Sequence, residues 1–338
     1  MLRQSLFFFV VLTLVFSSCQ WAPASWQTEE AKSEDMRIHR YDRLVDEFVS
    51  LNSFTALQRM NTEYPRATRL LIEDVLAIGT VQDELIEQRL REFYLDSTMQ
   101  VLIDDVHKEY ADLRGEEKEI FSVFTHIKKA DRNFRIPLVY VQVSGLNQSI
   151  VVGDSVLGIS LDKYLGHDYP LYKKYYHDYQ RRPMDRSRLV PEALFFYLTH
   201  EYPLPDNQVH TLLDYIVNFA KIHWIIAKYR DVPLMREAGL DDERIDWYSK
   251  NESEVWKTLN DTRMLYSSDM TMVRRFMMPR ANTPYISEDA PDQIGLWIGL
   301  QIVGHYMERH PDTKIGDLLR MTDYNKLLLE SGYNPSAK

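Results

Sequence analysis

Two neighbouring stretches decide the fold class of this chain: residues 136–143, IPLVYVQV, and residues 150–161, IVVGDSVLGISL. The first stretch is rich in β-branched residues and partly alternating, which is typical of a strand. Pro137 suits the start of that strand, because proline cannot donate to a sheet ladder. The second stretch predicts a β-hairpin with its turn at Gly153-Asp154. Together they predict one small β-sheet in the middle of the chain.

Helical periodicity dominates on both sides of this sheet. After the sheet, the longest predicted helix runs from Asp206 to about Tyr229, with a broad apolar face. We therefore expect an α+β protein that is predominantly α-helical, with a small central β-sheet. Before the sheet, apolar residues recur at helical spacing in residues 41–49, 68–77, 84–94 and 96–108 and in a segment that Gly115 opens.

The first residues resemble the leader of a bacterial lipoprotein. Arg3 gives a basic start, and residues 6–16, LFFFVVLTLVF, form an apolar run that fits a secretory signal and is too short to span a membrane. Ser17-Ser18-Cys19 follows, where a lipobox places its lipidated cysteine. We expect residues 1–18 to be a signal peptide and residues 19–35 to be a lipidated flexible tether. The alternative is a plain secretory signal that contains a cysteine.

The cysteine count favours lipidation. Cys19 is the only cysteine, so no disulfide can form within the chain, and acylation would cap a thiol that is otherwise exposed to an oxidising compartment. Acyl chains gain about 0.8 kcal/mol per buried methylene, so two or three chains anchor a domain firmly. We find no other segment long and apolar enough to cross a bilayer. The protein is expected to be tethered to a membrane by its lipid.

Composition sets limits on the partners. Hydrophobic residues make up 45% of the chain and charged residues 27%, which is normal for a globular protein with a sizeable core. The net charge of −10 argues against binding nucleic acid and against an electrostatic attachment to anionic lipid.

No catalytic motif is visible. A zinc peptidase needs H-E-x-x-H on one helix, but His200-Glu201 is followed by Tyr-Pro-Leu, and Pro203 prevents the helix from continuing. His223 has Phe219 and Ala227 at the i−4 and i+4 positions, so it lacks a second ligand there. We expect both histidines to be helix-capping or hydrogen-bonded residues. No G-x-S-x-G motif and no marked acid/base pair of carboxylates occurs.

Four segments together resemble the gliding-motility lipoprotein B (GldB) family of the Bacteroidota, in which a lipobox is expected. The similarity spans roughly Leu138 to Pro335, and the helical region before it carries little of the resemblance. At Asp292-Gln293 the family more often has a Gly-Arg-like pair. The four segments are LGISLDKYLGHDYPLY (157–172), NESEVW (251–256), APDQIGLWIGLQIVGHYME (290–308) and LLLESGYNP (327–335).

The family in turn resembles gluzincin-type peptidases distantly. In those enzymes a long helix carries H-E-x-x-H, and a later helix begins Asn-Glu, with the Glu as third zinc ligand. This chain keeps the order but lacks both histidines, so of the three ligands only Glu252 remains and a metal site is not expected. The resemblance implies a degenerate zincin-like domain over residues 135–338, packed with an N-terminal helical region, residues 36–134, as one globular unit.

Two groups of residues are candidates for a site. Asn251, Glu252 and Glu254 are either a relic of the peptidase site or a helix-capping box, which the spacing Asn251-x-x-Glu254 favours. The second group belongs to a predicted helix over residues 294–307, whose glycines would let it pack closely against the long helix. It is either a packing surface or a partner surface, and its members are Gly295, Trp297, Gly299, Gln301 and Tyr306.

The resemblance implies a protein that acts without catalysis. We expect an outer-membrane lipoprotein on the periplasmic face that serves the envelope machinery of gliding motility and type IX secretion by protein–protein binding. It would need no cofactor beyond the lipid on Cys19, and no small-molecule substrate or nucleic acid. Two alternatives remain open: a hydrolase that uses Glu252 and His223 with a substrate-induced metal, and a periplasmic ligand-binding module with a closed apolar pocket.

Overall fold

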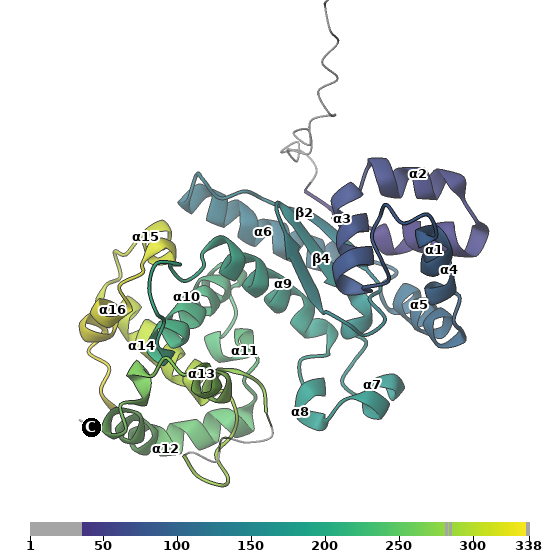
Figure 1. The fold of residues 1–338 in the computed structure, drawn as a ribbon. Coiled ribbons are helices and arrows are strands. Elements are labelled where there is room, and N and C mark those ends of the chain that lie inside the picture. Colours follow the sequence, from purple (N-terminus) through teal and green to yellow (C-terminus); the bar gives the residue numbers. More distant parts are fainter. Residues whose placement is uncertain (1–35, 281–282, 284–285, 336–338) are drawn as a thin grey trace, which may run out of the picture. The chain divides into compact units, whose positions relative to one another are not determined.

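The computed structural model describes residues 36–280, 283 and 286–335 (Figure 1). The predicted signal peptide, the tether and Cys19 lie outside these described residues. The chain from Met36 onward forms one compact unit. It is mostly helical with a single four-stranded sheet among the described residues, which confirms the predicted α+β class.

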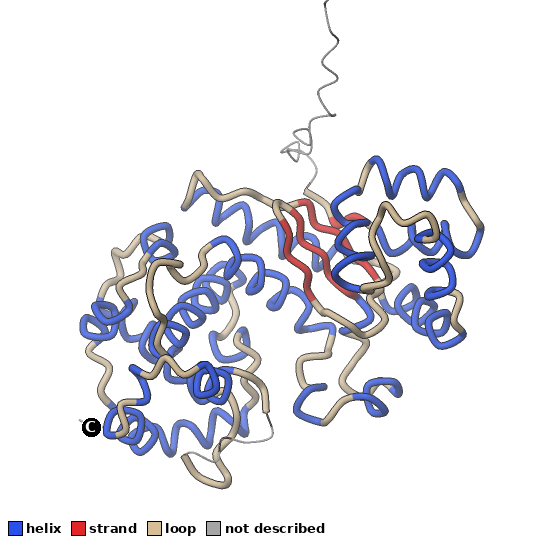
Figure 2. Tube along the Cα trace, in the orientation of Figure 1, coloured by secondary structure: helices blue, strands red, loops and turns tan. Residues whose placement is uncertain are grey.

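The sheet has the strand order β1-β2-β4-β3 (Figure 2). Strand β2 (Leu138–Gln142) runs parallel to β4 (Val156–Ser160), and β3 (Ile150–Gly153) pairs with β4 as an antiparallel hairpin. The predicted strand and hairpin are confirmed, but the turn lies one residue later than predicted, at 154–155, where Ser155 has φ of 59°. Strand β1 (Ile38–His39) pairs with β2 and is too short to have been predicted from sequence periodicity.

Of the N-terminal helices, α1 (Tyr41–Leu51) and α3 (Pro65–Arg69) contact this sheet. Helix α1 buries Tyr41, Leu44, Val45, Phe48 and Val49, as their helical spacing predicts, and the ring of Tyr41 lies 5.7 Å from that of Tyr140 on β2. The purple and blue helices α1 to α5 lie to the right of the sheet in Figure 1. The helices that precede β2 are α1 (Tyr41–Leu51), α2 (Phe54–Thr62), α3 (Pro65–Arg69), a π-helix (Leu70–Val75), α4 (Ile86–Tyr94), α5 (Ser97–Glu109) and α6 (Arg114–Ala130).

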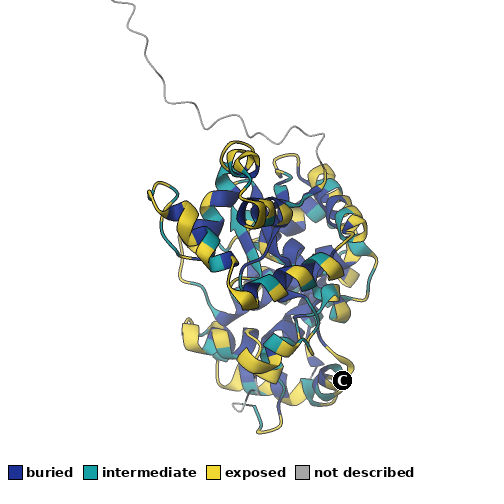
Figure 3. Cartoon of the chain, turned by 90° about the vertical axis from the view of Figure 1, so that its right-hand side faces the viewer, coloured by how far each residue is buried: buried dark blue, intermediate teal, exposed yellow. Residues whose placement is uncertain are grey.

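The C-terminal half is built around α10 and α14, which contact each other over much of their length. Both are apolar on several faces, and most of their residues are buried. Figure 3 shows buried residues on the inner sides of the helices and exposed residues on the outside of the chain. The helices are α7 (Pro170–Tyr175), α8 (Asp178–Arg181), α9 (Arg186–Glu201), α10 (Leu212–Arg230), α11 (Leu234–Glu237), α12 (Asp242–Asp261), α13 (Met270–Met277), α14 (Ile294–Arg309), α15 (Ile315–Arg320) and α16 (Tyr324–Ser331).

The long helix α10 starts later than predicted. Its predicted start is Asp206, whereas the first helical residue is Leu212. A capping box explains the difference, because the backbone N–H of Thr211 donates to the Asp214 carboxylate at 2.7 Å while the Thr211 side chain accepts from the first turn. Residues 206–211 therefore form the entry to the helix.

Candidate functional site

The predicted residues of α14 lie mainly in the core. Gly295 and Gly299 are buried, and Trp297 is only 6% exposed, with its ring 5.2 Å from that of Tyr248. Tyr306 is buried, and Gln301 is half-buried. These five residues are distributed along the packing faces of one helix and do not converge on an opening.

The capping box predicted at Asn251-x-x-Glu254 is wrong. Helix α12 begins at Asp242, and its cap is Asp241, whose carboxylate accepts from the backbone N–H of Arg244 at 2.9 Å. Asn251 lies in the middle of this helix and donates to the carbonyl of Trp247, which is one turn earlier. The expectation of a helix that begins at Asn251-Glu252 is therefore also wrong.

Glu252 makes a structural contact. Its Oε1 accepts a hydrogen bond of 2.9 Å from the hydroxyl of Tyr333, near the end of the described chain. Glu254, two residues on, is exposed. Glu252 thus ties the C-terminal segment to α12, and its similarity to a zinc ligand stays a prediction.

The two histidines examined in the sequence lie in different environments. His223 on α10 is buried, its ring stacks on Phe195 at 4.4 Å, and its Nδ1 has no hydrogen-bond partner in the described chain. The expected hydrogen bond is therefore missing at this nitrogen. Burial, helped by the charge of Arg188, lowers the pKa of His223 to about 3, so the ring is neutral at physiological pH. His200 is exposed in the last turn of α9.

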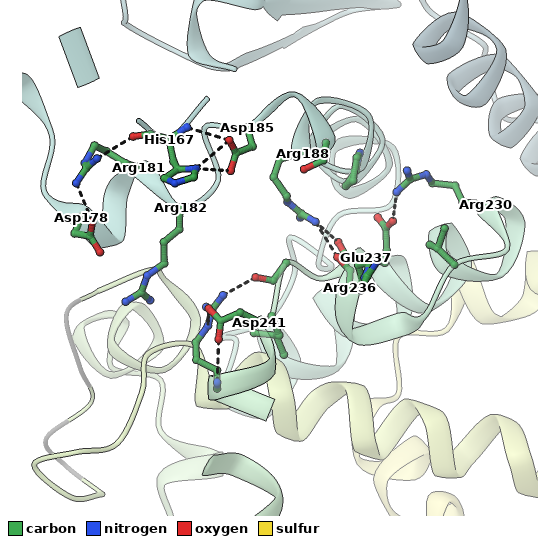
Figure 4. Close-up of a pocket in the computed structure, with 16 residues that line it drawn as sticks. His167, Asp178, Arg181, Arg182, Asp185, Arg188, Arg230, Arg236, Glu237 and Asp241 are labelled. Atoms are coloured by element: carbon green, nitrogen blue, oxygen red, sulfur yellow. Dashed lines mark hydrogen bonds and ion pairs between the residues drawn. The ribbon is translucent and has the colours of Figure 1, made fainter. Parts of the chain in front are cut away.

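A different set of residues surrounds an open cleft of about 620 Å³ (Figure 4). The cleft lies among α8, the first turns of α9, the end of α10 and the segment that leads through α11 into α12. Its lining holds six arginines and four acids, in a chain whose net charge is −10. They are the arginines Arg181, Arg182, Arg188, Arg230, Arg236 and Arg244 and the acids Asp178, Asp185, Glu237 and Asp241.

Helix caps and a tight turn shape the backbone at the floor of this cleft. Asp231 ends α10 in the left-handed region, and Pro233 caps the short helix α11. Gly239 then turns the chain with φ of +77°, which glycine adopts without steric cost, and Asp241 starts α12. The tight sequence of caps and turns brings residues 230–244 back against α9.

Three of the arginines are held by carboxylates. Arg230 forms ion pairs with Glu237 and with Glu119, the latter at 2.8 Å. Arg244 donates to Asp241 at 3.0 Å and to the side chain of Gln293 at 2.9 Å. Arg181 donates to Asp178 at 2.8 Å and to the carbonyl of His167 at 2.9 Å. These paired groups serve as the framework of the cleft.

Arg188 is held without a carboxylate. Its Nη1 donates to the carbonyls of Arg236 and Glu237 at 3.0 and 2.9 Å, and no acid in the described chain forms an ion pair with it. Burial lowers the pKa of its guanidinium, while the charges of Glu192 and Glu237 oppose that shift. A desolvated cation without an ionic partner is a favourable position for an anion.

Two further arginines keep free donors. Arg236 is exposed and makes no side-chain hydrogen bond or ion pair with the described residues. The side chain of Arg182 is 39% exposed, and its single contact is to the buried carboxylate of Asp292 at 3.3 Å. Figure 4 shows that Arg182, Arg188 and Arg236 come from different segments around the opening.

The acids of the cleft and His167 make contacts with other charged groups of the protein. Both ring nitrogens of His167 face carboxylates, Nδ1 at 3.2 Å from Asp185 and Nε2 at 3.3 Å from Asp168, so each is engaged within the protein. Burial raises the pKa of Glu237, and its Oε1 has no hydrogen-bond partner in the described chain. The geometry suits recognition of an anion through charge-assisted hydrogen bonds.

This cleft was not predicted from the sequence. One signal was visible, since residues 181–188, RRPMDRSR, hold four arginines in eight positions. That density alone does not distinguish a solvated surface from a cleft, because the other arginines come from the distant segment 230–244.

Comparison with known proteins gives one match. A family model described as gliding motility protein GldB matches residues 24–335. The match includes the helical region before Leu138, which the four segments of the sequence analysis had left largely outside the resemblance. No curated protein and no solved structure matches the chain.

Proposed function

The chain belongs to the gliding motility protein GldB family, and from this premise we propose that it is a non-catalytic lipoprotein of the outer membrane that works by binding other proteins. Membership of the family assigns it to gliding motility. Its partners, in this proposal, are components of the envelope machinery for gliding and type IX secretion.

The arginine-lined cleft supports a binding role. Its carboxylates are engaged by arginines, by His167 or by the backbone at the start of α12, and three arginines keep donors for an external group. Charged groups fixed in this way favour recognition of a complementary surface. The cleft also differs from the closed apolar pocket expected of a small-molecule binding module, because charged side chains dominate its wall.

The membrane attachment is assigned to the lipid on Cys19. In the part of the chain that the structure describes, no helix has the length and apolar character needed to cross a bilayer. The residues after Cys19 are Gln-Trp-Ala-Pro-Ala, and the first acids are Glu29 and Glu30. Surface-exported lipoproteins of the Bacteroidota usually carry acids close to the cysteine. Because the first acids come later here, we assign the protein to the periplasmic face of the outer membrane.

Crosslinking in intact cells tests the binding role. The full-length protein, expressed at its natural level, would be crosslinked briefly, solubilised and purified, and the attached proteins identified by mass spectrometry. We expect components of the gliding or secretion machinery to be enriched over an unrelated lipoprotein of equal abundance. Enrichment no greater than that of the control would contradict the proposal.

A further inference from the structure

The cleft divides its arginines into two groups with different roles. Arg181, Arg230 and Arg244 are neutralised by acids, so they fix the shape of the wall. The second group consists of Arg182, Arg188 and Arg236, which we call the open arginines. Among the described residues, the only ion pair of the open arginines is the 3.3 Å contact between Arg182 and Asp292.

Arg188 is the best-defined anion position among the open arginines. Two backbone carbonyls hold its Nη1, which leaves the edge formed by Nε and Nη2 without a partner in the described chain. The backbone of Gly239 lies against one face of the guanidinium, since a Cβ there would be 3.0 Å from both Cζ and Nη2. A guanidinium fixed at one edge and one face presents a preorganised fork, which matches the two oxygens of a carboxylate.

The charge balance of the cleft limits the ligand. Glu119 and Asp292, outside the lining, pair with Arg230, Arg182 and Arg244, so the positive charges of the cleft left without an ion pair among the described residues are those of Arg188 and Arg236. Two such charges suit one or two carboxylates, whereas a polyphosphate would also meet the four acids of the wall. The cleft of about 620 Å³ lies within the range of roughly 300–1,000 Å³ typical of ligand sites, so it holds a short segment of chain.

Other parts of the wall fit a peptide. Pro191, Val232 and Leu240 offer apolar surface to side-chain methylenes. A peptide with acidic side chains carries carboxylates and methylenes together, so it suits both the open arginines and this apolar surface.

We propose that this cleft binds an acidic peptide segment of a partner protein, whose carboxylates are received by Arg188 and Arg236, with Arg182 at the rim. This inference rests on the proposed function and specifies the chemistry of the partner. A phosphate-bearing ligand is an outcome of the test that would count against it.

Fluorescence anisotropy with the full-length protein in detergent micelles tests the inference. The probe is a short fluorescein-labelled peptide of glycine and serine with two adjacent central glutamates and blocked ends. At low ionic strength we expect it to bind, and the matched peptide with two glutamines to bind at least about tenfold more weakly. Equal binding of the two peptides would overturn the proposal, as would displacement of the probe by inorganic phosphate at concentrations equal to those of the unlabelled peptide.

Variants locate the binding. Arg236→Gln and Arg188→Gln are each expected to weaken binding of the glutamate peptide by about tenfold. Arg236→Gln remains informative if Arg188→Gln fails to fold, because the Arg236 side chain is exposed and makes no hydrogen bond or ion pair with the described residues. The matched control is Arg132→Gln, an exposed position on the loop after α6, which should bind as the wild type does.

The same variants separate this inference from the proposed function. If Arg188→Gln and Arg236→Gln bind the peptide as tightly as the wild type does, the inference fails. Capture of envelope proteins by the wild-type chain in intact cells would then still support the proposed function. If the wild-type chain captures none, the proposed function fails, whatever the peptide does.

Discussion

A Cβ atom on Gly299 of α14 would lie 2.4 Å from the carbonyl oxygen of Ile216 on α10. It would also lie 2.8 Å from the Cγ2 atom of Ile216 and 2.9 Å from the Cβ of Ala220. Real Cβ atoms do not approach a backbone carbonyl this closely, so the two central helices of the C-terminal half are in contact because this position has no side chain.

Replacing Gly299 by alanine is therefore expected to destabilise the protein by about 1–3 kcal/mol, and leucine by more, because α14 must move away from α10. Gly304 on the same helix is the control, since a Cβ there meets nothing within 4 Å. Gly304→Ala should be stabilising by up to about 1 kcal/mol, because alanine is the better helix former. Urea unfolding of the wild type, Gly299→Ala and Gly304→Ala measures the difference in the free energy of unfolding. Equal stability of Gly299→Ala and Gly304→Ala would refute the packing argument.

Trp297→Ala is expected to cost about 3–5 kcal/mol through the cavity it leaves. The indole is buried, and its Nε1 has no hydrogen-bond partner in the described chain, so the loss comes from packing alone. Trp247→Ala, at a half-buried position on α12, should cost clearly less. Thermal unfolding of both variants and the wild type gives the shift in melting temperature. An unchanged melting temperature for Trp297→Ala would instead indicate a role in binding a partner.

Stability should rise with pH above neutrality because of Lys221. This side chain is buried, its Nζ donates to the carbonyls of Leu319 and Met321 at 3.1 and 2.8 Å, and burial lowers its pKa to about 7. Between pH 7 and 10.5 the unfolded chain therefore binds more protons than the folded one, so the free energy of unfolding increases with pH by up to about 1.4 kcal/mol per unit.

The variant Lys221→Met tests this pH dependence. It should remove the increase, whereas Lys257→Met, at an exposed position on α12, should keep it. Urea unfolding at several pH values between 7 and 9 gives the slopes. Parallel slopes for the wild type and Lys221→Met would show that another group titrates.

The parts of the fold that were predictable have local signals. The hairpin β3–β4 has alternating β-branched residues and a turn, and α14 has an apolar helical pattern closed by a polar end. The errors arose where two local signals competed. Asn251-x-x-Glu254 satisfies a capping pattern inside a helix that Asp241 had already capped, and Asp206 precedes the stronger capping box at Thr211.

The cleft could not be predicted in this way. Whether an arginine is neutralised depends on residues far along the chain, as in the pair of Arg230 with Glu119. The isolation of Arg188 depends on the turn at Gly239, which brings backbone carbonyls to it and no carboxylate. Tertiary approach decides these contacts, and a single sequence does not record it.

The purified protein should contain no stoichiometric zinc. Glu252, the remaining candidate ligand, accepts a hydrogen bond from Tyr333, and no cluster of three His, Cys, Asp or Glu side chains within the described residues has metal-binding geometry. Glu252→Ala should leave the metal content unchanged and cost about 1 kcal/mol of stability through the lost hydrogen bond, and Glu252→Gln should cost less. About one zinc per chain, lost in Glu252→Ala, would contradict this prediction and revive the hydrolase alternative.

Cys19→Ala should release the protein from the membrane or stop the processing of its signal peptide. The acyl chains on Cys19 are the proposed attachment, and about 0.8 kcal/mol per buried methylene would be lost with them. Palmitate labelling of growing cells, followed by separation of membranes, measures both lipidation and attachment. Ser18→Ala is the matched control, because it keeps a small residue beside the cysteine and should still be labelled. Palmitate labelling that persists in Cys19→Ala would refute the anchor. The orientation has its own test, because digestion of the wild-type protein by proteinase added to intact cells would refute a periplasmic location.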